Sequence, residues 1–114
     1  MVEPETFIKL ELELRRGVIV LAALSQLKSP QYGYSLRQAL SERGMEIDEG
    51  TLYPLLRRLE AQGLIASEWR VETGPPRRYY VLNADGRKLY QKLVKTWRRL
   101  SEVMESLDLE GGAR

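Results

Sequence analysis

Residues 48–63 read DEGTLYPLLRRLEAQG, and their spacing predicts an amphipathic helix with well-marked ends. Asp48 is a favourable N-cap, and Gly63 can close the C-terminus. One stripe is apolar and should be buried: Leu52, Leu55, Leu56 and Leu59. The opposite face consists of Gly50, Pro54, Arg57 and Ala61, flanked by Tyr53 and Arg58. The helix is therefore expected to pack on one side and to present a partly basic surface on the other.

Two helices are expected before this stretch. Residues 7–14 alternate in a strand-like way but run straight into a helical pattern, so they are interpreted as an irregular or helical lead into a helix that ends near Lys28. Residues 29–33 form a loop, and a second helix covers residues 34–42 with Gly44 as its C-cap. The expected core positions of the two helices are Leu14, Val18, Leu21, Leu24, Leu27, Leu36, Ala39 and Leu40.

A β-hairpin and a long helix are expected after residue 63. Residues 64–71 and 77–82 are strand-like, and Gly74 with two prolines marks the turn between them. The last helix opens at Asn83, a good N-cap, and continues to about Leu107. Its apolar residues form a heptad seam: Tyr90, Leu93, Trp97, Leu100, Met104 and Leu107. A helix of about 24 residues is roughly 36 Å long, more than the small body can cover, so the seam should pack on a second copy.

This order of elements predicts a mainly α fold with a small β-hairpin. The architecture is a winged helix-turn-helix plus a long C-terminal dimerisation helix. Residues 1–83 are assigned to a DNA-binding domain with an N-terminal helical lead, and residues 84–114 to the dimerisation helix and tail.

The composition argues against enzymatic chemistry. The chain lacks cysteine and histidine, which excludes disulfides and removes the commonest general base and transition-metal ligands. The sequence contains no nucleophile–base pair, phosphate-binding glycine loop or metal-ligand spacing, so neither catalysis nor a cofactor or metal is expected. The uncharged run over residues 17–27 is too short to span a bilayer, and the start lacks the order of a secretory signal. A cytoplasmic location is therefore expected, with no membrane partner.

The charge is unevenly distributed. Residues 50–99 contain 11 Lys and Arg against 4 Asp and Glu, a balance of +7, whereas the remainder carries −5. This asymmetry favours an anionic partner such as DNA, with an ordinary solvated charge pattern as the alternative. Gly50 would allow close approach to phosphate, Thr51 and Tyr53 offer hydroxyls, and Arg57 could contact phosphate or guanine. Arg77 and Arg78 on the hairpin could reach phosphates or a minor groove.

Two aromatic positions leave alternatives open. Either Tyr79 or Tyr80 must face inward, because side chains alternate along a strand. Trp97 lies in the middle of the seam and could meet its mate in a two-fold dimer. Paired tryptophans could form a slot for planar ligands, or they could simply anchor a packed interface.

Several motifs together closely resemble the PadR family of transcriptional regulators, over about residues 15–107. They are YGY at 32–34, EGTLYPLLRRLE at 49–60, GLI at 63–65, GPPRRYY at 74–80 and DGR at 85–87. The chain is similar to the short branch of the family, which has a single C-terminal helix. One departure is Asn83, where the family usually has Thr, and both residues are helix N-caps.

The resemblance implies site residues and partners. It implies double-stranded DNA bound by Tyr34, Glu49, Gly50, Thr51, Tyr53, Pro54, Arg57, Arg58, Pro76, Arg77 and Arg78. It implies a homodimer joined by the N-terminal and last helices, through Leu12, Val18, Tyr90, Leu93, Trp97, Leu100, Met104 and Leu107. In some members of the short branch, a tryptophan matching Trp97 lines a pore that binds flat aromatic compounds, which implies a planar aromatic inducer.

The leading hypothesis is a ligand-responsive repressor that binds a palindromic operator as a homodimer. Its two recognition helices would lie about one DNA turn apart, roughly 34 Å. Two alternatives are a sequence-neutral architectural DNA-binding protein, which would show little site preference, and a winged-helix module that binds protein, which would show no DNA affinity.

Overall fold

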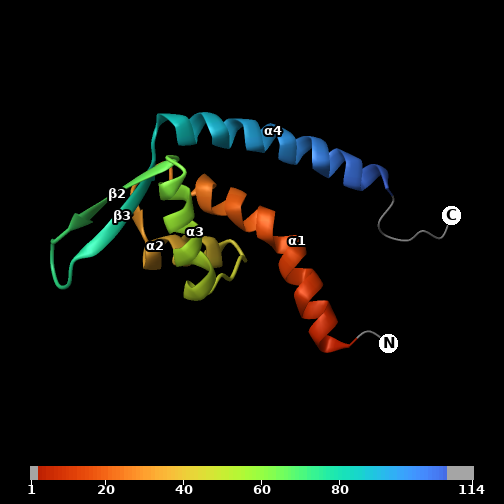
Figure 1. The fold of residues 1–114 in the computed structure, drawn as a ribbon, viewed down its shortest axis with the longest axis horizontal. Helices are drawn as coiled ribbons and strands as arrows, with labels where there is room; N and C mark the ends of the chain where they lie inside the picture. The colour runs from red at the N-terminus through yellow and green to blue at the C-terminus, as the bar shows by residue number, and fades with distance from the viewer. Residues whose placement is uncertain (1–2, 108–114) are drawn as a thin grey trace.

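The computed structural model describes residues 3–107, and the predicted tail beyond them lies outside this range. The elements follow the order α1 (Pro4–Ser25), β1 (Gln31–Tyr32), α2 (Gly33–Glu42), α3 (Glu49–Ala61), β2 (Ile65–Arg70), β3 (Arg77–Leu82) and α4 (Ala84–Ser106) (Figure 1). The fold is thus mainly helical with a small antiparallel sheet, which confirms the predicted winged helix-turn-helix followed by one long helix.

The core lies between α2, α3 and the C-terminal half of α1. Helical spacing brings apolar side chains to the inner face of each helix, and the side chains with almost no exposure are Leu24, Leu27, Leu36, Leu52 and Leu56. The four leucines predicted as the inner stripe of α3 are all buried. Burying one such side chain stabilises the fold by about 1.5–3 kcal/mol, so this stripe firmly sets which face of α3 points outward.

α1 differs from its prediction in extent. It begins at Pro4, so the alternating segment 7–14 is regular helix, because proline at the first position and Glu5 in the first turn favour a helix start. It ends at Ser25, before Lys28. Leu14 was expected in the core but is 75% exposed, because only the C-terminal half of α1 contacts the body, and Ile19 and Ala23 fill the core positions.

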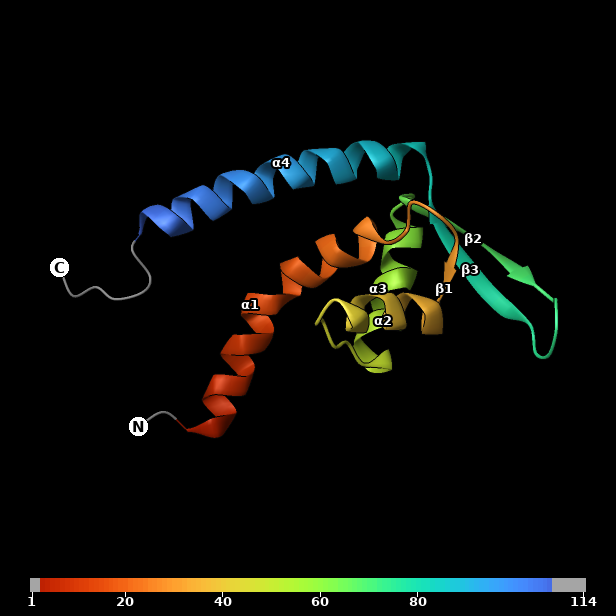
Figure 2. The same cartoon turned by 180° about the vertical axis from the view of Figure 1, so that it is seen from behind.

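The sheet contains a strand that the sequence did not predict. The strand order is β1–β3–β2, and both pairings are antiparallel. β1 lies in the expected loop and pairs Gln31 with Tyr80 and Tyr32 with Tyr79. Figure 2 shows the β2–β3 hairpin extending away from the helices. We call this hairpin, residues 65–82, the wing. Gly74 at its tip has a φ of 84°, which confirms the turn expected there.

α4 is anchored at its first turn and then leaves the body. The Asn83 side chain accepts a hydrogen bond from the Gly86 N–H (2.8 Å) and donates one to the Gly63 carbonyl oxygen (2.7 Å), which confirms the predicted N-cap. Gly86 lies against the Leu64 carbonyl so closely that a Cβ would overlap it. Beyond its first turns α4 extends past the body (Figure 1). No helix within residues 3–107 combines the length and apolar character that crossing a membrane requires.

Candidate nucleic-acid interface

The outward face of α3 carries the residues expected to meet DNA. Gly50, Thr51, Pro54 and Arg57 are exposed, because the buried leucine stripe occupies the opposite side of the helix. Pro54 lies inside the helix, where it cannot donate a backbone hydrogen bond. The Asp48 carbonyl accepts hydrogen bonds from the Thr51 and Leu52 N–H groups (3.2 and 3.0 Å). The neighbouring Thr51 hydroxyl lowers the pKa of the Asp48 carboxyl, so Asp48 is ionised at neutral pH beside the positive end of α3.

Two predicted residues at the start of α2 and α3 are placed differently from that face. Glu49 forms an ion pair with Arg37 (3.1 Å), whose Nε donates to the Ile47 carbonyl oxygen (3.1 Å). Tyr34 is 58% exposed, and it lines a shallow hollow beside Arg37 on α2. Glu49 therefore fastens α3 to α2.

Tyr53 connects α2 to α3. It is half-buried, and its ring packs against Gly33 at the start of α2. A Cβ at position 33 would overlap the Tyr53 hydroxyl and ring carbons. The glycine between the two tyrosines of residues 32–34 thus allows the close approach of the two helices.

Strand alternation separates the two wing arginines. Arg77 lies over the Tyr32 ring, with its guanidinium carbon 4.5 Å from the ring centre. Arg78 lies on the opposite face of β3, on the same side as Tyr80. Of the two alternative inward tyrosines, Tyr80 is the buried one, and burial raises the pKa of its hydroxyl.

A groove of about 690 Å³ runs between α3 and the wing, and we call it the α3–wing groove. Of the residues predicted to contact DNA, five line it: Tyr53, Arg57, Pro76, Arg77 and Arg78. Six others do not line it: Tyr34, Glu49, Gly50, Thr51, Pro54 and Arg58. The predicted residues therefore form two surfaces, the outer face of α3 and the groove beside it.

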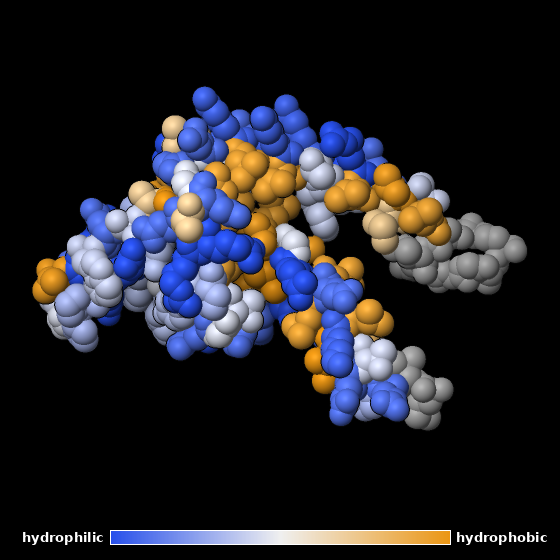
Figure 3. Space-filling model, in the orientation of Figure 1, coloured by the Kyte–Doolittle hydropathy of each residue, from blue (hydrophilic) through white to orange (hydrophobic). Residues whose placement is uncertain are grey.

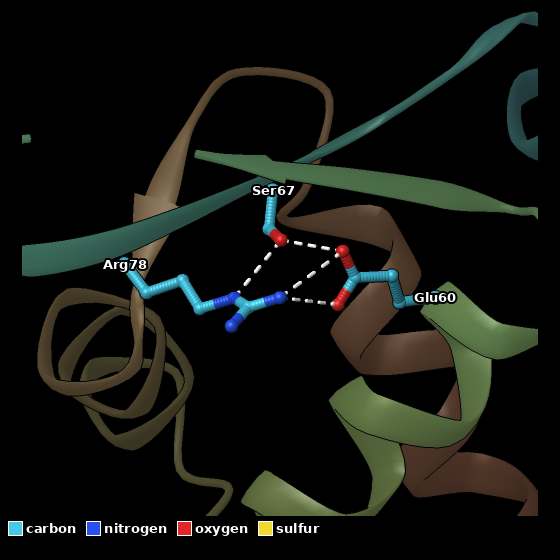
Figure 4. A network of polar contacts seen from close by, with 3 residues as sticks. All are labelled: Glu60, Ser67 and Arg78. Atoms are coloured by element: carbon cyan, nitrogen blue, oxygen red, sulfur yellow. Dashed lines mark hydrogen bonds and ion pairs between the residues drawn. The ribbon is translucent and has the colours of Figure 1, made fainter. Parts of the chain in front are cut away.

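Sequence reasoning missed an acidic residue in this groove. Glu60, at the C-terminal end of α3, forms an ion pair with Arg78 (3.1 Å), and Ser67 of β2 bonds to both side chains (Figure 4). Glu60 and Arg78 are 18 residues apart, so no local spacing could have indicated the pair.

The basic half of the chain is divided between two regions. Six of its 11 Lys and Arg residues lie on α4: Arg87, Lys88, Lys92, Lys95, Arg98 and Arg99. The outer side of α4, away from α1, is correspondingly hydrophilic (Figure 3). Only five of the cations lie on α3 and the wing, so the charge asymmetry overstated the basicity of the groove.

An apolar surface is exposed on α1 and α4 and is visible in Figure 3. Its members are Phe7, Ile8, Leu10, Leu12 and Leu14 of α1, and Trp97, Leu100, Val103, Met104 and Leu107 of α4 and its C-cap. Tyr90 and Leu93, predicted in the same seam, instead pack partly against the core of their own chain. A hollow of about 480 Å³ lies between the two helices, and Val18, Tyr90 and Trp97 are among the residues that line it.

Within residues 3–107, no group of acidic side chains is arranged to hold a metal ion.

Comparisons with known proteins agree on one family. The model of the "Transcriptional regulator PadR-like family" matches residues 20–92. The transcriptional regulator Rv3488 of Mycobacterium tuberculosis is 42% identical over 76 residues, which cover 66% of this chain and 71% of that protein. A PadR family regulator from Eggerthella lenta superposes with a TM-score of 0.82 at 40% identity, covering 94% of this chain and 96% of the other. A PadR-like transcription factor from Bacteroides fragilis gives a TM-score of 0.74 at 35% identity, covering 87% and 98%.

Proposed function

Because this chain belongs to the PadR-like family of transcriptional regulators, we propose that it is a homodimeric repressor that binds a palindromic operator and responds to a planar aromatic ligand. The family consists of regulators, not enzymes. The observation that carries the DNA-binding part is the convergence of Tyr53, Arg57 and Arg77 from separate elements on one groove beside the exposed face of α3.

In this proposal α3 enters the major groove. Gly50 and Thr51, near the N-terminus of α3, approach the DNA backbone and base edges, as the second helix of a helix-turn-helix does. Arg57 contacts either guanine or phosphate. Arg77 is carried by the wing to the adjacent phosphates or minor groove, and Pro76 stiffens the backbone before it.

The dimer is supported by the apolar surface of α1 and α4. Exposed apolar patches of this kind on a protein mark interaction surfaces. Leu12, Leu100, Met104 and Leu107 are exposed in the single chain and would be covered by a second copy. A two-fold dimer then presents two α3 helices, which requires a palindromic site with half-sites about one turn, roughly 34 Å, apart. Residues 1–83 would supply DNA binding and residues 84–114 dimerisation.

The ligand response is supported by the hollow between α1 and α4. Trp97 and Tyr90 give it aromatic walls, to which a planar ring can stack. A ligand shifts the protein only if it binds one arrangement of the two α3 helices more tightly than another. Trp97→Ala should therefore abolish binding of a planar dye. Unchanged dye binding together with a weaker dimer would make Trp97 a packing residue instead.

The experiment that tests DNA binding is a fluorescence-anisotropy titration with the duplex upstream of the protein's own gene. Random-sequence duplex serves as competitor, at two salt concentrations. Tight, salt-sensitive binding that survives the competitor is expected. Equal affinity for both duplexes would favour an architectural role, and no binding at low salt would contradict DNA binding altogether.

A further inference from the structure

Glu60 is unexpected in its position if the α3–wing groove receives DNA phosphates. It is the one carboxylate among the residues that line the groove, beside Arg57, Arg77 and Arg78. A negative charge there repels phosphate, and the repulsion is stronger near a protein surface than in bulk water. Raw charge attraction alone would therefore be better served by a neutral residue at this position.

The Glu60 carboxylate is occupied by Arg78 and Ser67. The Arg78 Nη2 donates to both carboxylate oxygens, at 3.1 and 3.4 Å, and its Nε donates to the Ser67 hydroxyl at 2.9 Å. The Ser67 hydroxyl donates in turn to Glu60. Figure 4 shows the resulting closed ring of three side chains from α3, β2 and β3. We call this ring the α3–wing latch.

Aromatic rings complete the surroundings of Arg78. Its guanidinium carbon lies 5.8 Å from the ring centres of both Trp69 and Tyr80, within cation–π distance. The Arg78 and Glu60 side chains are 41% and 30% exposed, so solvent screens their attraction only in part. The contacts act together to fix the guanidinium between α3 and the wing.

Arg77 is held very differently. Its guanidinium rests on the Tyr32 ring, and within residues 3–107 no carboxylate forms an ion pair with it. Arg77 is also exposed, whereas Arg78 is half-buried. The two neighbouring arginines therefore differ in their availability to phosphate.

We propose that Glu60 determines specificity by holding Arg78 in the α3–wing latch. The inference rests on the proposed DNA binding. Arg78 is then a positioning residue that sets the distance between α3 and the wing, and Arg77 is the wing cation that meets phosphate. The latch lowers the attraction for any duplex and keeps the two DNA-contacting elements at the spacing that suits the operator.

The test compares salt dependence in the full-length protein with random-sequence duplex as the probe. Each phosphate that a cation neutralises contributes about 0.9 to the slope of log K against log salt concentration. Arg77→Met should lower the slope by about 0.9, whereas Arg78→Met should leave it unchanged. Glu60→Gln should raise the slope by about 0.9, because it releases Arg78, and Glu60→Gln/Arg78→Met should return to the wild-type slope.

A second measurement reports on the latch without DNA. Amide hydrogen exchange in the wing should become faster in Glu60→Gln and in Arg78→Met, and remain unchanged in Arg77→Met, because only the first two break the ring. A wild-type protein that binds no duplex at low salt would overturn the proposed DNA binding and this role of Glu60 together. Wild-type binding with a slope that falls in Arg78→Met, or wing exchange unaffected by Glu60→Gln, would overturn the latch alone.

Discussion

Arg57 and Arg58 are consecutive on α3 but face different surroundings. Both are exposed, yet only Arg57 lines the α3–wing groove. The rotation of about 100° between neighbouring helical residues places their side chains on different faces, so one can face DNA while the other points along its edge.

Arg57→Ala should weaken binding to the operator by roughly 1–3 kcal/mol if Arg57 reads a base. Arg58→Ala is the matched control and should have a smaller effect, because Arg58 does not line the groove. Anisotropy titrations against operator and random duplex measure both. A uniform loss on every sequence would make Arg57 a phosphate contact, and no loss would remove it from the interface.

Gly33 illustrates how a single missing Cβ positions the interface. By helix propensity alone, Gly33→Ala would stabilise α2 by up to about 1 kcal/mol. The Tyr53 ring reverses this sign, because the added Cβ overlaps it, and we expect the free energy of unfolding to fall by about 1–3 kcal/mol. Urea denaturation measures the change. Gly17→Ala on α1, with no atom within 4 Å of its added Cβ, is the control and should not destabilise the chain.

At the scale of elements, the attachment of α4 depends on its first turn. Asn83 bonds forward to Gly86 and back to Gly63, so one side chain joins the end of α3 to the start of α4. The close contact between Gly86 and Leu64 completes the joint. The direction of the whole exposed helix is set by these few residues.

Asn83→Ala should lower the free energy of unfolding by about 1 kcal/mol, because it removes the cap. Asn83→Thr should lose less, since Thr can still cap the helix and only the bond to Gly63 disappears. Thermal denaturation followed by circular dichroism distinguishes the two. Equal losses in both variants would mean that the bond to Gly63, not the cap, provides the stability.

At the scale of the whole molecule, the chain is elongated, and its ends are covered by little else. The principal extents are 59 × 33 × 25 Å, and the N-terminal half of α1 and the C-terminal half of α4 both project from the body (Figures 1 and 2). The apolar side chains on these projections contribute nothing to the core of a single chain, so they are available to a second one.

Leu100→Glu tests that availability. Leu100 is 53% exposed, so in an isolated chain the substitution should change the stability little, whereas in a dimer it would place a charge inside the interface. We expect a shift to monomer in sedimentation velocity at micromolar concentration. Gln91→Glu adds the same charge on the opposite side of α4 and should leave association unchanged. A monomeric wild-type protein would contradict the proposed dimer.

Local periodicity was sufficient to predict most of the fold. The leucine stripe of α3, the Asn83 cap and the turn at Gly74 are all where their patterns indicated, because each depends on residues close together in the chain. The wing strand at residues 77–82 agrees with its prediction for the same reason. The resemblance to PadR regulators, based on contiguous motifs, is confirmed by the family match over residues 20–92.

The tertiary structure alone decided the pairings between distant residues. β1 has two residues, too few to show any period, and exists because it pairs with β3. The choice of Tyr80 over Tyr79 as the buried ring, and the pairing of Glu60 with Arg78, depend on which face of the wing meets α3. The same packing turned six of the expected DNA-facing cations onto α4. A sequence pattern specifies which face of an element is apolar, but only packing specifies which other element that face meets.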